Sequence, residues 1–186
     1  MKRLLLYPLL LIFLCGCAGQ ASDINHILNL RSELLNSNGC NFEAIITADY
    51  GEQVHTFQMM CQGDKNGDLD FKVVDPETIA GITGNITDTG GSLTFDDKAL
   101  VFNLLADGQI SPVSAPWILL KGLRNGYISA SGKDELYIRT EIDDSFSGEA
   151  LHIDVWLEQS GKPARCEIVW KGRRIIAIDI RNFTLL

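Results

Sequence analysis

The 186-residue sequence lacks an apolar run long enough to cross a membrane as a helix, and it has little positive charge. Sixteen Lys and Arg residues stand against 24 Asp and Glu residues, which gives a formal net charge of −8 and a pI near 4.8. An acidic chain repels the phosphates of nucleic acids and the headgroups of anionic lipids. Nucleic-acid binding and a polybasic membrane contact are therefore disfavoured.

Catalytic and metal-binding motifs are also lacking. The three histidines, His26, His55 and His152, lie far apart, and none has a nucleophile or ligand motif beside it. There is no Gly-x-Ser-x-Gly, HExxH or phosphate-binding loop. Residues 64–75 imitate a calcium-binding EF-hand loop, but Leu69 stands where Gly is required, which favours a polar hairpin turn. We expect no enzymatic activity, no cofactor and no metal site.

The amino terminus has the form of a bacterial lipoprotein signal. Lys2 and Arg3 precede an apolar run over residues 4–14, and the sequence Leu-Cys-Gly-Cys then ends at Cys17. This ending resembles a lipobox, which implies that the Cys17 thiol receives a diacylglyceryl group and that residues 1–16 are removed. Residues 17–22 would form a short lipidated linker. The alternative is an ordinary cleaved signal with accidental cysteines.

The mature chain is expected to form one α+β domain over residues 23–186. Apolar residues at helical spacing predict a helix over residues 23–37, after which the apolar period changes to two and indicates strands. Turns are predicted at Tyr50-Gly51 and at Asn66-Gly67, the second as a type I′ hairpin turn. A second helix over residues 116–123 precedes a meander of long strands. About ten strands joined by short turns imply an antiparallel sheet that twists and curls.

The cysteines suggest one covalent link. A two-residue turn at Tyr50-Gly51 would place Cys40 directly opposite Cys61 across the first hairpin, and an extracytoplasmic location would permit a disulfide between them. A register error of one residue would remove this pairing. Cys166 lies on the same face of its strand as Ala164, Ile168 and Trp170, so we expect a buried and inert thiol.

The order of these features resembles the LolA/LolB lipoprotein-carrier superfamily. The resemblance rests on the lipobox, the N-terminal helix, the hairpins, the loop Gly108-Gln109-Ile110-Ser111-Pro112, the short helix and the final meander. It is strongest for clostridial and other Gram-positive lipoproteins of this shape, including the spore-germination lipoprotein that partners a cell-wall amidase. The resemblance implies an open β half-barrel with two helices over an apolar concave face that can accept acyl chains.

Aromatic and aliphatic side chains carry the binding hypothesis. Trp117, Ile118, Leu119 and Leu120 begin the second helix and could form a movable lid that contacts an apolar ligand, or could simply plug the half-barrel as core. Trp156 lies opposite the apolar residues of its strand, where an exposed Trp would suit a partner surface.

We therefore expect a membrane-anchored lipoprotein on the outer face of the cytoplasmic membrane, held there by membrane lipid through diacylglyceryl-Cys17. Its half-barrel would bind an apolar ligand such as an acyl chain or a lipidated peptide. The alternative is a scaffold lipoprotein that binds a cell-wall hydrolase or another envelope protein.

Overall fold

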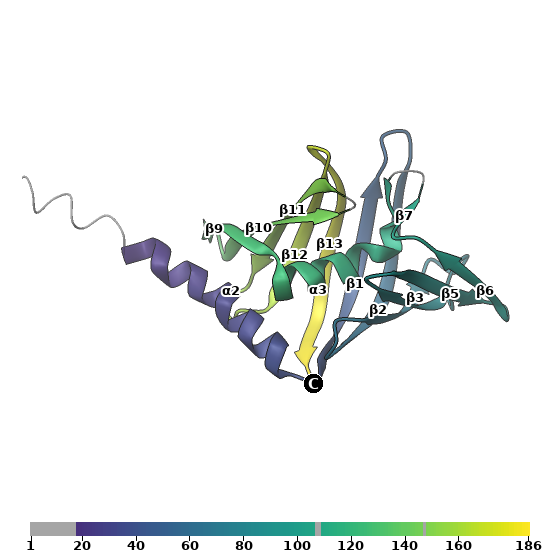
Figure 1. The fold of residues 1–186 in the computed structure, drawn as a ribbon, viewed down its shortest axis with the longest axis horizontal. Coiled ribbons are helices and arrows are strands. Elements are labelled where there is room, and N and C mark those ends of the chain that lie inside the picture. Colours follow the sequence, from purple (N-terminus) through teal and green to yellow (C-terminus); the bar gives the residue numbers. More distant parts are fainter. Residues whose placement is uncertain (1–17, 107–108, 147) are drawn as a thin grey trace, which may run out of the picture.

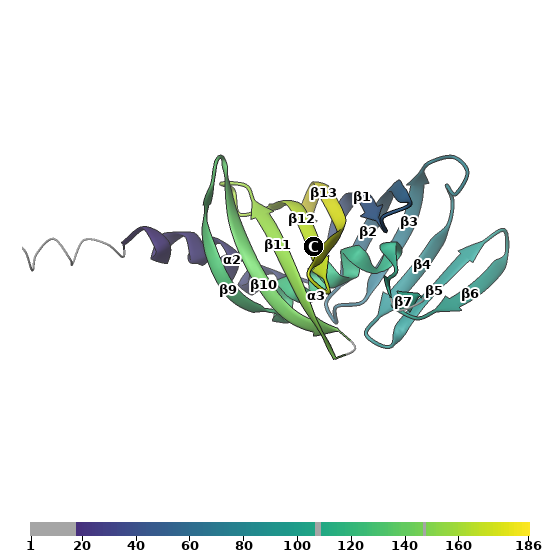
Figure 2. The same cartoon turned by 90° about the horizontal axis from the view of Figure 1, so that it is seen from above.

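The computed structural model describes residues 18–106, 109–146 and 148–186. Its main feature is a curved, unclosed sheet of eleven antiparallel strands in the order β6-β5-β4-β3-β2-β1-β13-β12-β11-β10-β9. Figure 2 shows the strands rising as two walls, with a helix lying between them. This arrangement confirms the predicted α+β class and the open half-barrel.

The elements follow the chain in a simple order, with neighbouring strands mostly consecutive in sequence (Figure 1). The large sheet consists of β1 (Gly39–Asp49), β2 (Val54–Asp64), β3 (Leu69–Asp75), β4 (Thr83–Thr87), β5 (Gly90–Phe95), β6 (Lys98–Phe102), β9 (Tyr127–Asp134), β10 (Tyr137–Phe146), β11 (Glu149–Leu157), β12 (Pro163–Trp170) and β13 (Arg173–Leu185). The remaining elements are α2 (Ala18–Asn36), the small hairpin of β7 (Leu105–Ala106) and β8 (Gln109–Ile110), the 3₁₀ turn η2 (Pro112–Ser114), and α3 (Ala115–Asn125).

The core lies on the concave face of the sheet. In β1, every second residue from Cys40 to Ala48 is buried, and the intervening residues are more exposed. Ala44 and Ile46 pair with Ile180 and Ile178 of β13, so the apolar rows of neighbouring strands are in register. The period-two alternation therefore predicted the buried face of β1 correctly, because successive side chains of a strand point to opposite faces of the sheet.

Helix α2 begins earlier than the sequence predicts. It starts at Ala18 rather than at residue 23, so the described part of the predicted linker is helical. Ile27, Leu30 and Leu34 are buried against the fold, whereas Leu28 and Leu35 are 43% and 51% exposed. The buried stripe is thus narrower than expected, because α2 packs against β9, β10 and α3 with one side only. Its N-terminal part extends beyond the sheet (Figure 1).

The turn between β2 and β3 differs from the predicted type I′ hairpin. Gly63 pairs with Leu69, and the Asp64 backbone N–H donates to Asp68 O at 2.9 Å, which leaves a three-residue loop. Within this loop, Gly67 alone has a positive φ, at 98°, whereas a type I′ turn needs two such residues. Asp64 Oδ1 accepts hydrogen bonds from the backbone N–H groups of residues 66, 67 and 68 at 2.8, 2.8 and 2.9 Å. This capping carboxylate favours the longer loop.

The predicted pairing of Cys40 with Cys61 is wrong. The first hairpin closes at Asp49 and Val54, two residues later than assumed, so Cys40 pairs with Gly63 and Cys61 with Phe42. Both thiols are buried and free. Two cysteines offset by two residues on adjacent strands are diagonal neighbours, which lie too far apart for a bond without movement of the backbone. Cys166 is fully buried, as expected.

Among the elements that the sequence pattern did not predict are β9 and the 3₁₀ turn η2. Strand β9 was not predicted because it is mostly polar and has only one apolar face contact, through Ile128. The predicted loop that ends at Pro112 leads directly into the short 3₁₀ turn η2. The second helix, α3, extends one residue earlier and two residues later than predicted.

The cysteine arrangement is testable by counting thiols. In the full chain carrying Cys15→Ser and Cys17→Ser, we expect three reactive thiols after denaturation without reductant, because Cys40, Cys61 and Cys166 are free. In the native protein these thiols should react slowly, since burial raises the pKa of Cys40 to about 11. A count of one thiol in denaturant, rising to three with reductant, would show that Cys40 and Cys61 are bonded.

Candidate functional site

Helix α3 fills the middle of the trough that the concave face of the curved sheet forms. Pro116 stands in its first turn, where a missing N–H is tolerated, and Gly126 follows its end. The residues proposed as ligand contacts all lie in the core: Trp117, Ile118, Leu119 and Leu120 are 3%, 1%, 1% and 2% exposed. The structure brings the four together, in the arrangement expected of a plug.

The close approach of α3 to the sheet depends on two glycines. A Cβ atom at Gly122 would lie 2.7 Å from Ile153 Cδ1, and one at Gly63 would lie 2.6 Å from Leu120 Cδ1. Both distances are shorter than a normal carbon contact. Small residues on the helix and on β2 therefore let the helix sink into the trough.

Two arginines hold the C-terminal end of α3. Arg31 of α2 donates from Nε to Leu123 O at 2.7 Å and from Nη2 to Gly122 O and Gly126 O at 3.3 and 2.8 Å. A guanidinium at this position supplies a donor to the carbonyls of Leu123 and Gly126, adds a second donor to Gly122 O, which also accepts the Gly126 backbone N–H at 2.8 Å, and complements the negative end of the helix dipole. Arg124 of α3 donates to Lys65 O at 2.6 Å, which links the helix to the β2–β3 loop.

The concave face beyond α3 is open. We call the β4–β6 part of the sheet the wing, and its apolar concave residues Leu93, Phe95 and Leu100 the wing patch. Leu100 is 57% exposed, Phe95 is 39% exposed, and Leu93 is half-buried. The register places Leu93 opposite Leu100 and, through Gly84, in the same row as the buried Phe71. The wing patch is thus the outer continuation of the apolar core face.

Aromatic rings lying over glycines form the inner border of the wing patch. A Cβ atom at Gly84 would lie 2.5 Å from Phe71 Cζ, and one at Gly91 would lie 2.3 Å from Phe102 Cζ. The rings therefore cover the backbone of β4 and β5 where a side chain would otherwise stand. Beyond them the apolar surface continues to Leu100 without a helix above it.

The wing patch can do one thing chemically, which is to remove hydrocarbon from water. Burial of a half-exposed Leu or Phe side chain by a ligand is worth roughly 1 kcal/mol, since full burial gives about 1.5–3 kcal/mol. These residues are not among the ligand contacts predicted from the sequence. Their signal was present in the alternation of Leu93 with Phe95 and of Leu100 with Phe102 on either side of the turn at Asp96-Asp97.

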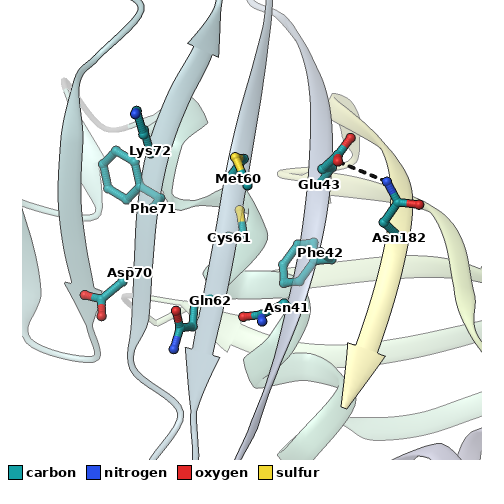
Figure 3. A pocket seen from close by; sticks show the side chains of 10 residues that line it. All are labelled: Asn41, Phe42, Glu43, Met60, Cys61, Gln62, Asp70, Phe71, Lys72 and Asn182. Atoms are coloured by element: carbon teal, nitrogen blue, oxygen red, sulfur yellow. Dashed lines mark hydrogen bonds between the residues drawn. The ribbon is translucent and has the colours of Figure 1, made fainter. Parts of the chain in front are cut away.

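A hollow of about 430 Å³ lies across the outer side of β1, β2, β3 and β13 (Figure 3). Its outward side chains are mainly polar, with the 54% exposed Met60 among them. Glu43 Oε1 accepts a hydrogen bond from Asn182 Nδ2 at 3.0 Å, and Oε2 accepts one from Gln58 Nε2 at 3.4 Å. Both carboxylate oxygens of Glu43 are thus occupied by side chains of neighbouring strands. The hollow is therefore part of a hydrogen-bonded outer face of the sheet.

The outer face of β10–β12 carries a charge network. His152 Nδ1 lies 2.7 Å from Asp143 Oδ1, and Arg139 forms an ion pair of 2.8 Å with Asp154. Partial burial lowers the pKa of His152, but the hydrogen bond with Asp143 and the nearby negative charges outweigh it and raise that pKa above 6.5. The pair therefore stabilises the fold below pH 6.5 while Asp143 remains ionised, and it loses this effect as the pH rises through the raised pKa of His152 or falls through the lowered pKa of Asp143.

Trp156 belongs to the same outer face, as predicted, but it is half-buried rather than fully exposed. Its indole Nε1–H donates to Asp134 Oδ2 at 2.6 Å. The guanidinium groups of Arg139 and Arg165 lie 5.7 and 5.4 Å from its ring centroid. These cation–π contacts and the hydrogen bond tie β9, β10, β11 and β12 together.

The described part of the chain shows no assembled histidine or metal site. His26, His55 and His152 lie on α2, β2 and β11. No group of three or more His, Cys, Asp or Glu side chains in the described residues is placed to hold a metal ion. None of the described helices combines the length and the apolar character needed to cross a membrane.

No protein-family model matches the sequence, and no curated protein matches it. Among solved structures, the chain is similar to a LolA superfamily protein from Nitrosomonas europaea, with 10% identity, a TM-score of 0.44, and coverage of 86% of this chain and 92% of that one. It is also similar to lipoprotein LppX from Mycobacterium tuberculosis, with 14% identity, a TM-score of 0.42, and coverage of 87% and 93%. For LprF from Mycobacterium bovis the identity is 9%, the TM-score 0.39, and the coverage 89% and 94%.

These likenesses concern overall shape. The expected resemblance to Gram-positive and spore-germination lipoproteins stays a prediction.

The role of Arg31 gives a prediction. Arg31→Ala should lower the free energy of unfolding by about 2 kcal/mol, because it leaves several carbonyls at the end of α3 without their charged donor. Arg31→Lys keeps the charge but not the fork of donors, so we expect an intermediate loss. Denaturant unfolding followed by circular dichroism measures both. Equal stability of Arg31→Ala and the native chain would contradict the assigned role.

Proposed function

We propose that this chain is a lipid-anchored extracytoplasmic protein that binds an apolar ligand, such as an acyl chain or a lipidated peptide, on the wing patch. The observation that carries the proposal is the row of half-buried Leu93 and exposed Phe95 and Leu100 on the concave face, where the helices do not cover the sheet. Apolar side chains gathered on a concave face favour an apolar occupant. No catalytic step is included.

The ligand would extend the existing core rather than replace part of it. Trp117, Ile118, Leu119 and Leu120 are buried, and α3 is held at one end by Arg31. The hydrocarbon would therefore lie beside α3, over the wing, with the closed part of the trough as its inner limit. This assignment moves the ligand contacts from the second helix, where the sequence placed them, to β5 and β6.

Anchoring is proposed from the sequence, because Cys17 lies outside the described residues. The described chain begins in α2 at Ala18, so residues 18–22 rise only about 8 Å as helix. A diacylglyceryl group on Cys17 would then hold the domain close to the outer face of the cytoplasmic membrane. Two acyl chains give a stable anchor, which suits a local receptor better than a carrier that leaves the membrane.

The anchor is tested by a pair of cysteine variants. Cys17→Ser should release the protein from the membrane fraction, because Ser cannot receive the diacylglyceryl group through a thiol. Cys15→Ser is the matched control and should leave the protein on the membrane, since Ser is a usual residue before the lipobox Gly. Cell fractionation and the mass of the mature chain are the readouts. A Cys17→Ser protein that stays on the membrane would remove the anchor from the proposal.

Ligand binding is tested on adjacent residues of β6. In the full chain carrying Cys17→Ser, Leu100→Gln should weaken binding of a fluorescent C16 fatty acid about five- to tenfold, which corresponds to roughly 1 kcal/mol of lost burial. Val101→Gln is the matched control, because Val101 is exposed on the same strand but faces the opposite side. Titration by fluorescence gives both affinities, and native mass spectrometry shows any lipid that co-purifies.

Equal effects of the two substitutions, or no binding of the fatty acid to the parent chain, would refute the wing patch as an apolar site.

A further inference from the structure

Strand β6 is an edge of the sheet whose protection is limited to its short length and to Lys98 at its first position. In the described sheet it has a neighbour, β5, on one side only. An edge strand presents unpaired N–H and C=O groups that can pair with another chain, and proteins usually block it with Pro, a bulge, inward charges or a covering element. The sequence of β6, Lys-Ala-Leu-Val-Phe, contains no Pro and has its single charge at the first residue. Its pairing with β5 is regular throughout.

Both faces of β6 are apolar. Leu100 lies on the concave side, in the row of Leu93, and is 57% exposed. Val101 lies on the outer side, in the row of Ser92 and Asn85, and is 82% exposed. Exposed apolar side chains on both faces of a bare edge favour a strand that would lie beside them in the same sheet.

The other edge of the sheet is treated differently. Strand β9 packs against α2, and its sequence is mostly polar. Its pairing with β10 is interrupted by a bulge between Glu141 and Ile142. A covering element, polar residues and a bulge are usual protections of an edge strand. Strand β9 has all three, whereas β6 has no covering helix and no bulge in its pairing.

The position of β6 also favours a partner outside the membrane. The N-terminal end of α2 and strand β6 lie at opposite ends of the long axis of the molecule (Figures 1 and 2). A domain attached through its N-terminus would therefore hold β6 at the end remote from the attachment.

The charge around β6 selects the kind of partner. Residues 88–104, which form β5 and β6 with their flanking turns, carry three carboxylates and one Lys side chain, a net charge of −2. Pairing of β6 with β6 of a second copy would bring two such acidic segments together, which is unfavourable. A basic segment would be attracted. Electrostatic complementarity therefore favours a different protein over a second copy of this chain.

We propose that the β6 edge docks an extended, apolar segment of another protein, flanked by basic residues, which adds to the sheet as a further antiparallel strand. Backbone hydrogen bonds to β6 supply affinity, and side chains beside Leu100 and Val101 supply specificity. This site goes beyond the proposed function, because it uses the backbone edge of β6 and the side chains on both of its faces, whereas the apolar ligand uses the concave face alone.

The first test uses a defined peptide, Lys-Lys-Val-Ile-Thr-Val-Lys-Lys, with the full chain carrying Cys17→Ser. We expect binding by fluorescence anisotropy and slowed amide hydrogen exchange in β6. The control peptide has the same side chains but N-methyl groups on alternate backbone amides, which removes the donors needed for strand addition. It should bind at least tenfold more weakly. A peptide with Glu in place of the flanking Lys residues should also bind more weakly.

The second test uses matched protein variants. Val101→Lys should weaken peptide binding at least tenfold, because it places a charge on the docking edge. Val54→Lys is the control, since Val54 is 61% exposed at the start of the interior strand β2. Leu93→Gln, one strand in from the edge, should weaken fatty-acid binding and leave peptide binding unchanged, which separates this site from the wing patch. Circular dichroism confirms that each variant is folded.

Three results would overturn the proposal. The first is equal binding of the N-methylated peptide, which would mean that side chains alone hold the peptide. The second is an unchanged affinity for Val101→Lys. The third is a dimer in sedimentation equilibrium that becomes monomeric in Val101→Lys, because the occupant of the edge would then be a second copy.

Discussion

The structure depends on covering the concave face of a sheet that does not close. Eleven antiparallel strands place a continuous apolar surface on one side, and without a cover that surface would meet water. Helix α3 supplies the cover over the middle strands, and Arg31 of α2 fixes its C-terminal carbonyls. The two helices thus act together, because α2 packs against β9 and β10 and at the same time holds α3 in place.

Much of this fold follows from local sequence. The period-two alternation of β1 identified its buried face, and Pro116 and Gly126 bounded α3 closely. The errors came from turns and tertiary contacts. A loop two residues longer than assumed moved Cys40 away from Cys61, and the Asp64 carboxylate stabilised a three-residue loop where a two-residue turn was expected. Strand β9 was missed because an edge strand covered by a helix needs little apolar alternation.

The candidate site was harder to predict than the fold. A short apolar helix bounded by Pro and Gly has the same sequence whether it plugs a trough or covers a ligand, and only its depth in the structure separates the two. Trp117 and its neighbours are deep because Gly63 and Gly122 allow close approach. For the wing patch, the alternation in β5 and β6 shows which side chains share a face, but whether that face is covered follows from how far α3 reaches across the sheet, which is a property of packing.

The wing patch and the free edge have a common origin. The sheet continues through β4, β5 and β6 beyond the helix that covers its middle, so the same three strands carry an uncovered concave face and an unpaired outer strand. Adjacent residues of β6 then face different surroundings, with Leu100 on the concave side and Val101 on the outer side. Because side chains alternate between faces while backbone groups lie in the plane of the sheet, one short strand can contact hydrocarbon with its face and a peptide with its edge. The closed trough provides the rigid support that holds this strand in position for both.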